Sequence, residues 1–272
     1  MDLGGYLAGM TDARRFALVT GASSGIGLEL AKQFVLHDFD LIICAEEAAI
    51  DQAADALSSS GASVTPVQAD LRTYEGVESL YSAAAATGRP LDAAALNAGV
   101  GLGGPFVETD LATELDLIDL NVKSTVHLAK RLLVDMVARN EGRVLITSSI
   151  GSTMPGTFHS VYNASKSFLQ SFAEAVQNEL KDTDVVITSL MPGPTDTNFF
   201  HRADMEDTRV GQGSKDDPAK VAKQGFDALM DGDRKVVAGS LKTKTMEAAS
   251  KVTPDALKAE QHRRMAEPGS GE

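Results

Sequence analysis

Tyr162 and Lys166 stand four residues apart, downstream of a serine pair at Ser148 and Ser149. Residues at this spacing share one face of a helix. A free tyrosine has a pKa of about 10, too high for efficient proton transfer at neutral pH. A lysine ammonium at ~4 Å, in an effective dielectric constant of ~20, stabilises a phenolate by ~4 kcal/mol, or about three pK units. These residues predict a proton relay in which Lys166 lowers the pKa of Tyr162 and a serine hydroxyl binds the reacting oxygen; the alternative is an inert, exposed helix pair.

A second motif, TGASSGIG, runs from Thr20 to Gly27 between an apolar run and a helical pattern. Glycines at this junction let backbone N–H groups and the positive end of a helix approach a pyrophosphate. The spacing of Gly21, Gly25 and Gly27 is neither the common G-x-G-x-x-G fingerprint nor a phosphate loop. A dinucleotide site is therefore predicted from its position on the first strand-to-helix turn, and a purely geometric tight turn is the alternative.

Apolar runs rich in β-branched residues alternate with longer stretches of helical periodicity, which predicts βαβ units. The expected strands are Phe16–Thr20, Leu41–Ala45, Ser63–Ala69, Leu91–Leu96, Arg143–Thr147, Val185–Leu190 and Lys235–Ala238. The predicted fold is α/β: a doubly wound, Rossmann-type, seven-stranded parallel sheet with helices on both faces.

The same pattern predicts the domain organisation. Residues 15–239 form one dinucleotide-binding and catalytic domain, preceded by an extension over residues 1–14. The polar connection 194–217 is expected to be a substrate lid, since long loops in compact domains are often functional. Residues 240–272 form a helical and polar tail whose end is predicted to be disordered.

The composition of the chain limits the classes of molecule that it is expected to bind. The net charge is −13 and no Lys/Arg cluster occurs, which argues against nucleic acid and anionic membranes. The lone Cys44 excludes an internal disulfide and fits a reducing cytosol, so a cytoplasmic location is expected. The chain shows no signal peptide, no apolar run that could span a bilayer and no metal-ligand spacing.

Five motifs together resemble the short-chain dehydrogenase/reductase family. They are TGASSGIG, LNAG at Leu96–Gly99, NVKST from Asn121, the serine pair and YNASK, and they follow the family's order over roughly residues 16–238. The resemblance implies that Tyr162 is the general acid and base and that Lys166 assists it and binds the nicotinamide ribose. Ser149, thirteen residues before the tyrosine, would polarise the substrate oxygen, and Asn121 would hold a water beside the lysine.

The resemblance also implies the cofactor contacts. Asp70 would bind the adenine amine or cap the next helix. The full expected set is Gly21, Ser23, Ser24, Gly25, Ile26, Gly27, Glu46, Asp70, Leu71, Asn97, Ala98, Gly99, Tyr162, Lys166, Pro192, Gly193, Thr195 and Thr197. Leu96 replaces an asparagine that the family more often carries, with no expected effect on the chemistry.

Cofactor preference depends on the end of the second strand, where the family places an aspartate for NAD or a following arginine for NADP. This chain has Ala45 and Glu46 there. A carboxylate would repel a 2′-phosphate, and no basic residue is expected nearby to compensate. NAD is therefore the predicted cofactor and NADP the possible one; a Glu46 that merely starts the next helix is the alternative.

The predicted activity is hydride transfer between a nicotinamide dinucleotide and a carbonyl/secondary alcohol pair. Two alternatives stay open: a nucleotide-binding scaffold without turnover, and a family member that catalyses epimerisation or dehydration. The substrate is expected to be a small-molecule carbonyl or alcohol that is apolar and of medium size, and His159 is given no role. The expected substrate-wall residues are Gly101, Leu102, Met154, Phe158, Phe199 and Phe200.

The family pairs two helices with their copies, which here correspond to Asp119–Arg139 and Tyr162–Lys181. Apolar residues such as Leu128, Val134, Phe168 and Phe172 are expected to exceed one core-facing stripe on these helices. A homodimer or homotetramer with isologous contacts is therefore predicted.

Overall fold

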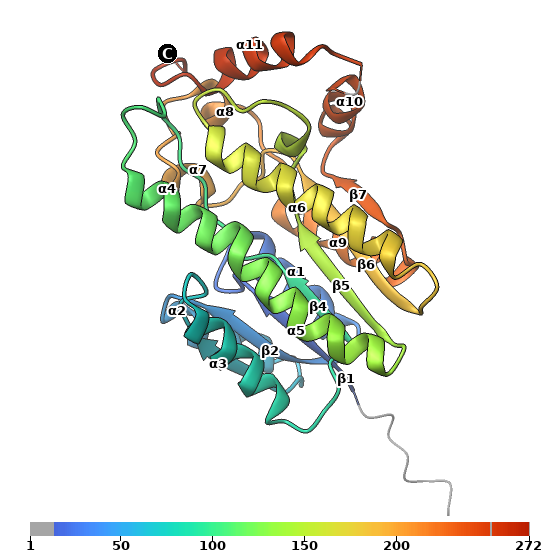
Figure 1. Ribbon diagram of the computed structural model, residues 1–272. Coiled ribbons are helices and arrows are strands. Elements are labelled where there is room, and N and C mark those ends of the chain that lie inside the picture. The colour runs from blue at the N-terminus through green and yellow to red at the C-terminus, as the bar shows by residue number, and fades with distance from the viewer. Residues whose placement is uncertain (1–13, 251, 272) are drawn as a thin grey trace, which may run out of the picture.

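A single parallel sheet of seven strands forms the centre of the protein, in the order β3-β2-β1-β4-β5-β6-β7 (Figure 1). The computed structural model describes residues 14–250 and 252–271, so residues 1–13 of the predicted extension lie outside the described residues. The strands are β1 Arg15–Thr20, β2 Phe39–Ala45, β3 Val64–Gln68, β4 Ala93–Leu96, β5 Gly142–Thr147, β6 Val185–Pro192 and β7 Lys235–Ala238. The doubly wound parallel fold predicted from the sequence is confirmed.

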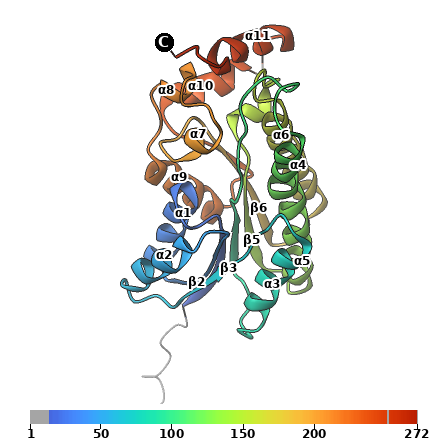
Figure 2. The same cartoon turned by 90° about the vertical axis from the view of Figure 1, so that its left-hand side faces the viewer.

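Helices cover both faces of the sheet. Figure 2 shows α1, α2 and α9 on one side and α3, α4, α5 and α6 on the other, with α7, α8, α10 and α11 gathered at one end. The helices are α1 Gly25–Leu36, α2 Ala49–Ser58, α3 Tyr74–Ala85, α4 Leu111–Ile118, α5 Ser124–Ala138, α6 Ser160–Glu179, α7 Phe199–Arg202, α8 Arg209–Gln212, α9 Pro218–Asp231, α10 Leu241–Ser250 and α11 Asp255–Ala266.

Two hydrophobic cores follow from this layering. Along β2, Leu41 and Ile43 join the core under α1, α2 and α9, while Ile42 and Cys44 join the core under α3, α5 and α6. Successive side chains of a strand point to opposite faces, so a strand buried on both sides reads as one continuous apolar run. This explains why the strands could be located from the sequence.

The strand order reverses beside β1. The chain builds β1, β2 and β3 outward in one direction and then returns to place β4 on the other side of β1. In open α/β sheets, ligands bind in the crevice outside the carboxyl ends of the strands at such a point. The turn after β1 and the loop after β4 both open into this crevice, which places the glycine-rich motif and Asn97 at its floor.

The C-terminal tail packs against the rest of the protein. Residues 255–266 form α11, and His262 and Ala266 of this helix are buried. Gly269 and Gly271 donate backbone hydrogen bonds to Asp207 in the lid. The helix α11 buries only a narrow strip of its surface, while most of its side chains face outward.

Candidate active site

A cavity of about 690 Å³ lies at the carboxyl end of the sheet and runs from the glycine-rich turn to α11. All the predicted cofactor and catalytic residues line it except Gly27 and Asn121. These two residues lie directly behind the lining and shape it, as described below.

Backbone geometry shapes the glycine-rich turn. Gly21 has a φ of +66°, a left-handed conformation that side chains disfavour. A Cβ on Gly27 would stand 2.0 Å from the carbonyl oxygen of Gly21, so only glycine fits there. Because α1 begins at Gly25, its unpaired N–H groups face the cavity beside Ser23 and Ser24. The turn therefore has the close backbone approach that a pyrophosphate needs.

The serine pair divides into two positions with different partners. Ser148 donates from Oγ to the carbonyl oxygen of Lys166 at 3.0 Å, which ties β5 to α6. Ser149 instead hydrogen-bonds the Tyr162 hydroxyl and accepts from the N–H of Gly151 at 3.0 Å. Lys166 donates from Nζ to the carbonyl oxygen of Thr147 at 2.9 Å. The structure therefore brings Ser149, Tyr162 and Lys166 together at the end of β5.

The expected direction of the Tyr162 pKa shift is wrong for the protein alone. Burial raises the pKa of the Tyr162 hydroxyl to about 12, against a hydrogen bond from Ser149 that lowers it. Burial also lowers the pKa of Lys166 to about 8. The Lys166 Nζ lies 5.8 Å from the centre of the Tyr162 ring, so desolvation outweighs the attraction that the sequence argument assumed.

Asn121 lies on a turn of π-helix at Asp119–Lys123, between α4 and α5. Its side chain is fully buried, donates to the carbonyl oxygen of Val100 at 2.9 Å and to Ser165 Oγ at 3.0 Å, and accepts from the N–H of Val100. It therefore fixes the loop after β4 against α6. A π-turn inside a helix often marks a functional position.

The loop after β6 reaches the cavity through Pro192, Gly193, Thr195 and Thr197. Thr195 pairs with Asp216 across an isolated bridge, so the two ends of the predicted lid meet. Asp216 also accepts from the N–H of Ser240 at 2.8 Å and from Thr243 Oγ1 at 2.5 Å. The base of the lid is thus fixed to the start of α10.

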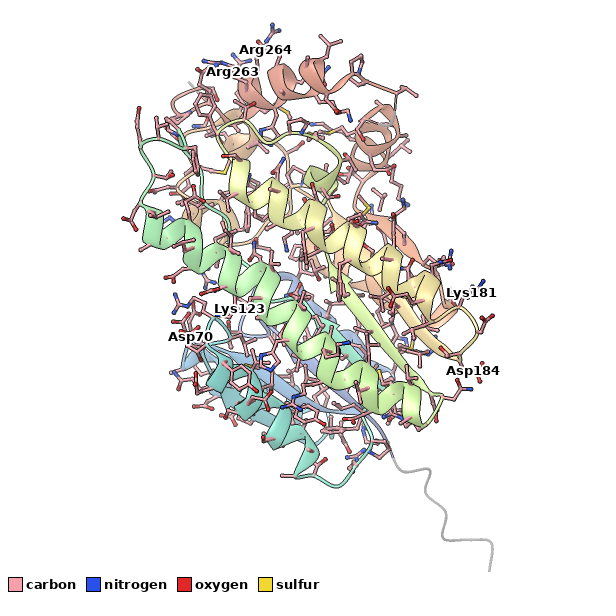
Figure 3. All side chains as sticks on the ribbon, in the orientation of Figure 1. Asp70, Lys123, Lys181, Asp184, Arg263 and Arg264 are labelled. Carbon is pink, nitrogen blue, oxygen red and sulfur yellow. The ribbon has the colours of Figure 1, made fainter. Side chains whose placement is uncertain are left out.

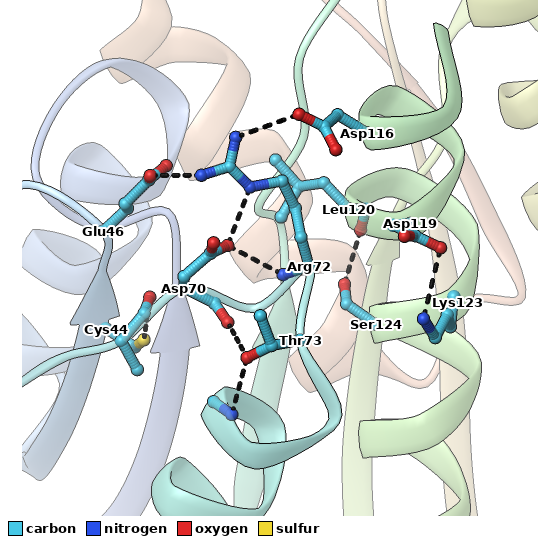
Figure 4. A network of polar contacts seen from close by, with 12 residues as sticks. Cys44, Glu46, Asp70, Arg72, Thr73, Asp116, Asp119, Leu120, Lys123 and Ser124 are labelled. Atoms are coloured by element: carbon cyan, nitrogen blue, oxygen red, sulfur yellow. Dashed lines mark hydrogen bonds and ion pairs between the residues drawn. The ribbon is translucent and has the colours of Figure 1, made fainter. Parts of the chain in front are cut away.

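The expectation that no basic residue lies near Glu46 is wrong. Figure 4 shows Arg72 bridging Glu46, Asp70 and Asp116. Arg72 contacts Asp70 at 2.9 Å and Asp116 at 3.6 Å, and its hydrogen bond lowers the pKa of Asp70. Arg202 makes a second ion pair, with Glu47 at 2.7 Å. Three carboxylates share the one guanidinium of Arg72, so this cluster keeps a net negative charge.

Asp70 does not cap the following helix. Thr73 does so, by accepting from the N–H of Gly76 at 2.9 Å. The Asp70 carboxylate is held by the Arg72 backbone and side chain and lines the cavity next to Leu71. Of its two expected roles, the position in the crevice is the one that the geometry supports.

The other end of the cavity has apolar walls. Gly101, Met154, Phe199 and Phe200 line it as expected, whereas Leu102 and Phe158 do not. Phe158 instead packs beside a small cluster of Phe200, Ala203, Met205 and Ala266 beneath α11. The Phe199 ring lies 5.2 Å from the Tyr162 ring, centre to centre, so the connection 194–217 packs against the predicted catalytic tyrosine.

Sequence reasoning missed the contribution of α10 and α11 to the cavity. Met246 from α10 and His262, Met265 and Ala266 from α11 all line it. The loop after β5 holds α11 in place: Thr157 Oγ1 donates to the carbonyl oxygen of Ala259 at 3.0 Å, and Lys258 Nζ donates to that of Thr153 at 3.1 Å. Figure 3 shows Arg264 pointing away from the protein on the opposite side of this helix.

Comparison with known proteins shows the family of this chain and relatives that share its fold. Residues 15–207 match a family model described as short chain dehydrogenase. The oxidoreductase UcpA of Salmonella typhimurium is 30% identical over 220 residues, covering 80% of this chain and 79% of that protein.

Two solved structures share the fold. A short-chain dehydrogenase/reductase from Burkholderia phymatum in complex with NAD has a TM-score of 0.81 at 22% identity, covering 88% of this chain and 92% of that one. A short-chain dehydrogenase from Sphingobium yanoikuyae in complex with NADPH has a TM-score of 0.76 at 23% identity, covering 87% and 94%.

Proposed function

Because this chain belongs to the short-chain dehydrogenase/reductase family, we propose that it transfers a hydride between a nicotinamide dinucleotide and a carbonyl/secondary alcohol pair. The observation that carries the proposal is the meeting of Ser149, Tyr162 and Lys166 in the cavity that begins at the glycine-rich turn. A proton donor, its hydrogen-bond partner and a dinucleotide crevice are the parts that this reaction needs.

The residues of the crevice fit a dinucleotide. Gly21 and Gly27 leave the backbone bare where a pyrophosphate would approach, and Glu46 and Asp70 stand at the adenosine end. Gly99 lacks a Cβ that would stand 3.3 Å from Lys166 Nζ, so the ammonium stays accessible from the cleft. A nicotinamide ring held beside Tyr162 would supply or accept the hydride.

The protein's own contribution is proton transfer and polarisation. Tyr162 is protonated at neutral pH, because burial raises the pKa of its hydroxyl, and can therefore donate to a carbonyl oxygen during reduction. Ser149, already hydrogen-bonded to Tyr162, binds the same substrate oxygen. Lys166 carries a positive charge at neutral pH, since its lowered pKa of about 8 still exceeds 7, and so favours loss of the tyrosine proton during alcohol oxidation.

Replacement of the proton donor tests this assignment. Tyr162→Phe should lower kcat by about 10²- to 10⁴-fold, the usual contribution of a positioned acid, while the dissociation constant of NADH stays within about threefold. Absorbance of the reduced cofactor measures turnover on a carbonyl panel, and fluorescence of bound NADH measures affinity. Tyr81→Phe, which alters a tyrosine on α3 that is hydrogen-bonded to Asp135, is the matched control.

Two results would contradict the proposal. Retention of most of the wild-type rate in Tyr162→Phe would remove the tyrosine from the mechanism. Cofactor binding without turnover of any carbonyl or alcohol by the wild type would favour the scaffold alternative, and substrate conversion without net cofactor oxidation would favour epimerisation or dehydration.

NAD is the cofactor that the adenosine end favours. The cluster around Arg72 retains a net negative charge, and Glu46 belongs both to it and to the cavity lining. A 2′-phosphate carries about −1.5 to −2 charge and would be repelled there. NADP remains the second possibility, since Arg72 and Arg202 lie close enough to offset part of this repulsion.

A further inference from the structure

His159 is a buried polar residue without a hydrogen-bond partner on its ring. It is 6% exposed, and no described residue bonds its Nε2. Its backbone is satisfied: the N–H donates to Gly156 and the carbonyl accepts from Asn163. A buried polar group left unpaired costs about 1–3 kcal/mol, so its presence calls for an explanation.

The position of this ring is specific. The imidazole stacks on the Tyr162 ring, with centres 4.3 Å apart and planes within 13°. His159 lines the cavity. If Gly101 carried a Cβ, that atom would stand 3.0 Å from His159 Nε2 and 2.5 Å from the Phe199 ring. Phe199 in the lid thus lies beside this nitrogen, and a small movement of the phenyl ring would open Nε2 to a molecule bound at Tyr162.

The residue before it is held in an unfavourable conformation. Phe158 has a φ of +64°, a region that bulky side chains disfavour, and its carbonyl accepts from the N–H of Gly104 at 2.9 Å. Such strain persists only where the surroundings impose it, and it is concentrated at functional sites. The strained turn sets where α6 begins and thereby places His159 against Tyr162.

A second imidazole completes the surroundings. His262 of α11 lies 6.3 Å from His159, ring centre to ring centre. Its Nδ1 lies 2.9 Å from the carbonyl oxygen of Thr157, which can only accept, so Nδ1 carries the proton and Nε2 is an acceptor. Burial, together with the neighbouring His262, lowers the pKa of His159 to about 3, so its ring is neutral and offers one donor and one acceptor.

We propose that His159 recognises the substrate, and that this substrate is a carbonyl or alcohol compound with a second hydroxyl group next to the reacting carbon and an otherwise apolar body. Because the imidazole stacks on the Tyr162 ring, a hydroxyl that it binds would lie near the oxygen bound by Tyr162. A neutral imidazole suits a hydroxyl better than a carboxylate or phosphate, for which a cation would be needed. Met154, Met265 and Phe199 supply the apolar walls. The inference rests on the proposed function, since it assumes that the reacting oxygen binds at Tyr162.

Two alcohols of the same shape provide the test: phenylethylene glycol, and α-ethylbenzyl alcohol, in which a methyl group replaces the terminal hydroxyl. Their binding to the full chain saturated with NADH is measured by calorimetry, so that no alcohol is turned over. Wild-type protein should bind the glycol about tenfold more tightly, the value of one hydrogen bond to a buried group. His159→Leu should lose this preference, and His159→Gln should keep part of it.

A control and a stability measurement separate recognition from packing. His37→Leu removes an exposed imidazole at the far end of α1 and should leave the preference intact. The melting temperature of His159→Leu should equal or exceed that of the wild type, because an unpaired polar group has been removed.

Three results would overturn the inference: equal or absent binding of the two alcohols by the wild type, an unchanged preference in His159→Leu, or a clear fall in its melting temperature. Turnover with NAD is measured separately on the same alcohols. A binding preference without any turnover would count against the proposed function and leave the role of His159 standing.

Discussion

Single residues at the two ends of the cavity differ in how they are stabilised. At the adenosine end, Glu46 and Asp70 are held by Arg72, so charge is matched with charge on a partly exposed surface. At the proposed reacting end, Lys166 is buried and Tyr162 is half-buried, and desolvation moves the pKa values of both. We therefore expect cofactor preference at the first end to respond to substitutions that change charge, and the protonation of residues at the second end to make stability depend on pH.

Substitutions of Glu46 test the role of charge at the adenosine end. Glu46→Gln keeps the shape of the side chain but removes one negative charge. It should raise the ratio of kcat/KM with NADP to kcat/KM with NAD by about tenfold. This corresponds to a fraction of the ~3 kcal/mol that a like charge costs at ~6 Å in a dielectric of ~20. Glu46→Arg should raise the ratio further. Steady-state kinetics with both cofactors measure this ratio, and Asp55→Asn, on an exposed position of α2 away from the cavity, is the control. A wild-type preference for NADP would show that Arg72 governs the site instead.

Substitution of Lys166 tests the effect of desolvation at the reacting end. Its pKa is about 8 when folded and 10.5 as the reference value, so the unfolded chain binds more protons between these pH values. Stability therefore rises with pH across this window, and the cost of the buried charge is present in full below pH 8. Lys166→Met should be more stable than the wild type at pH 7, by up to about 3 kcal/mol, and the gap should narrow by pH 10.

Denaturant unfolding at the two pH values measures this difference. Lys181→Met, at an exposed position labelled in Figure 3, should show no such dependence on pH. A constant gap between the wild type and Lys166→Met would mean that the ammonium is solvated and that its pKa is not lowered.

Elements differ in how much of them the sequence could predict. The central strands were located correctly because burial on both faces leaves continuous apolar runs such as Leu41–Cys44. The contribution of α11 to the cavity was missed because only His262 and Ala266 are buried along it, so its sequence shows no clear apolar stripe. The ion pairs of Arg72 were missed for a different reason: Glu46 lies 26 residues away, and local patterns carry no information about which side chains meet in space.

The attachment of α11 can be tested through two hydrogen bonds. Thr157→Val with Lys258→Met removes the donors that hold the helix to the loop after β5. Each bond contributes about 0.5–1.5 kcal/mol, so α11 should open about 10- to 100-fold more often. KM for the carbonyl substrate should rise severalfold while the dissociation constant of NADH is unchanged, because the glycine-rich turn is untouched.

Hydrogen exchange over residues 255–266 reports the opening directly. Arg264→Met, on the outer side of the helix, is the control and should change neither quantity. An unchanged KM despite faster exchange would mean that α11 does not contribute to the substrate wall.

At the scale of the whole molecule, one face carries exposed apolar side chains. They lie on α4 and α5, which follow one another along one line in Figure 1, and on α6, which runs beside them. Leu128, expected among them, is instead buried, because it faces the sheet rather than solvent. The exposed members are Leu111, Leu115, Ile118, Val134, Val137 and Phe168. Such a patch is typical of an interaction surface, and it agrees with the expected pairing of these helices with a second copy.

The oligomer is tested by placing a charge in this patch. Wild-type protein at micromolar concentration should scatter light as at least twice the 28.6 kDa of one chain. The double substitution Val134→Asp with Phe168→Asp should reduce the particle to a single chain. Burying each of these apolar side chains in the interface stabilises the oligomer by about 1.5–3 kcal/mol, which the aspartates would remove. Leu36→Asp, at an exposed position of α1 on the opposite side of the sheet, is the control. A wild-type particle of 28.6 kDa would refute the prediction.

No helix among the described residues is long and apolar enough to cross a bilayer. The cytoplasmic location stays a prediction, which fractionation of cells that express the chain would check.

The place of α11 in the chain has a consequence for synthesis. A ribosome that has released everything through β7 has produced the sheet, the glycine-rich turn and Tyr162, but not the wall formed by His262, Met265 and Ala266. During that interval the crevice would already accept a dinucleotide while its substrate end is open to water. Maturation of this protein would therefore proceed in two stages, with the capacity to hold a cofactor acquired before the capacity to choose a substrate.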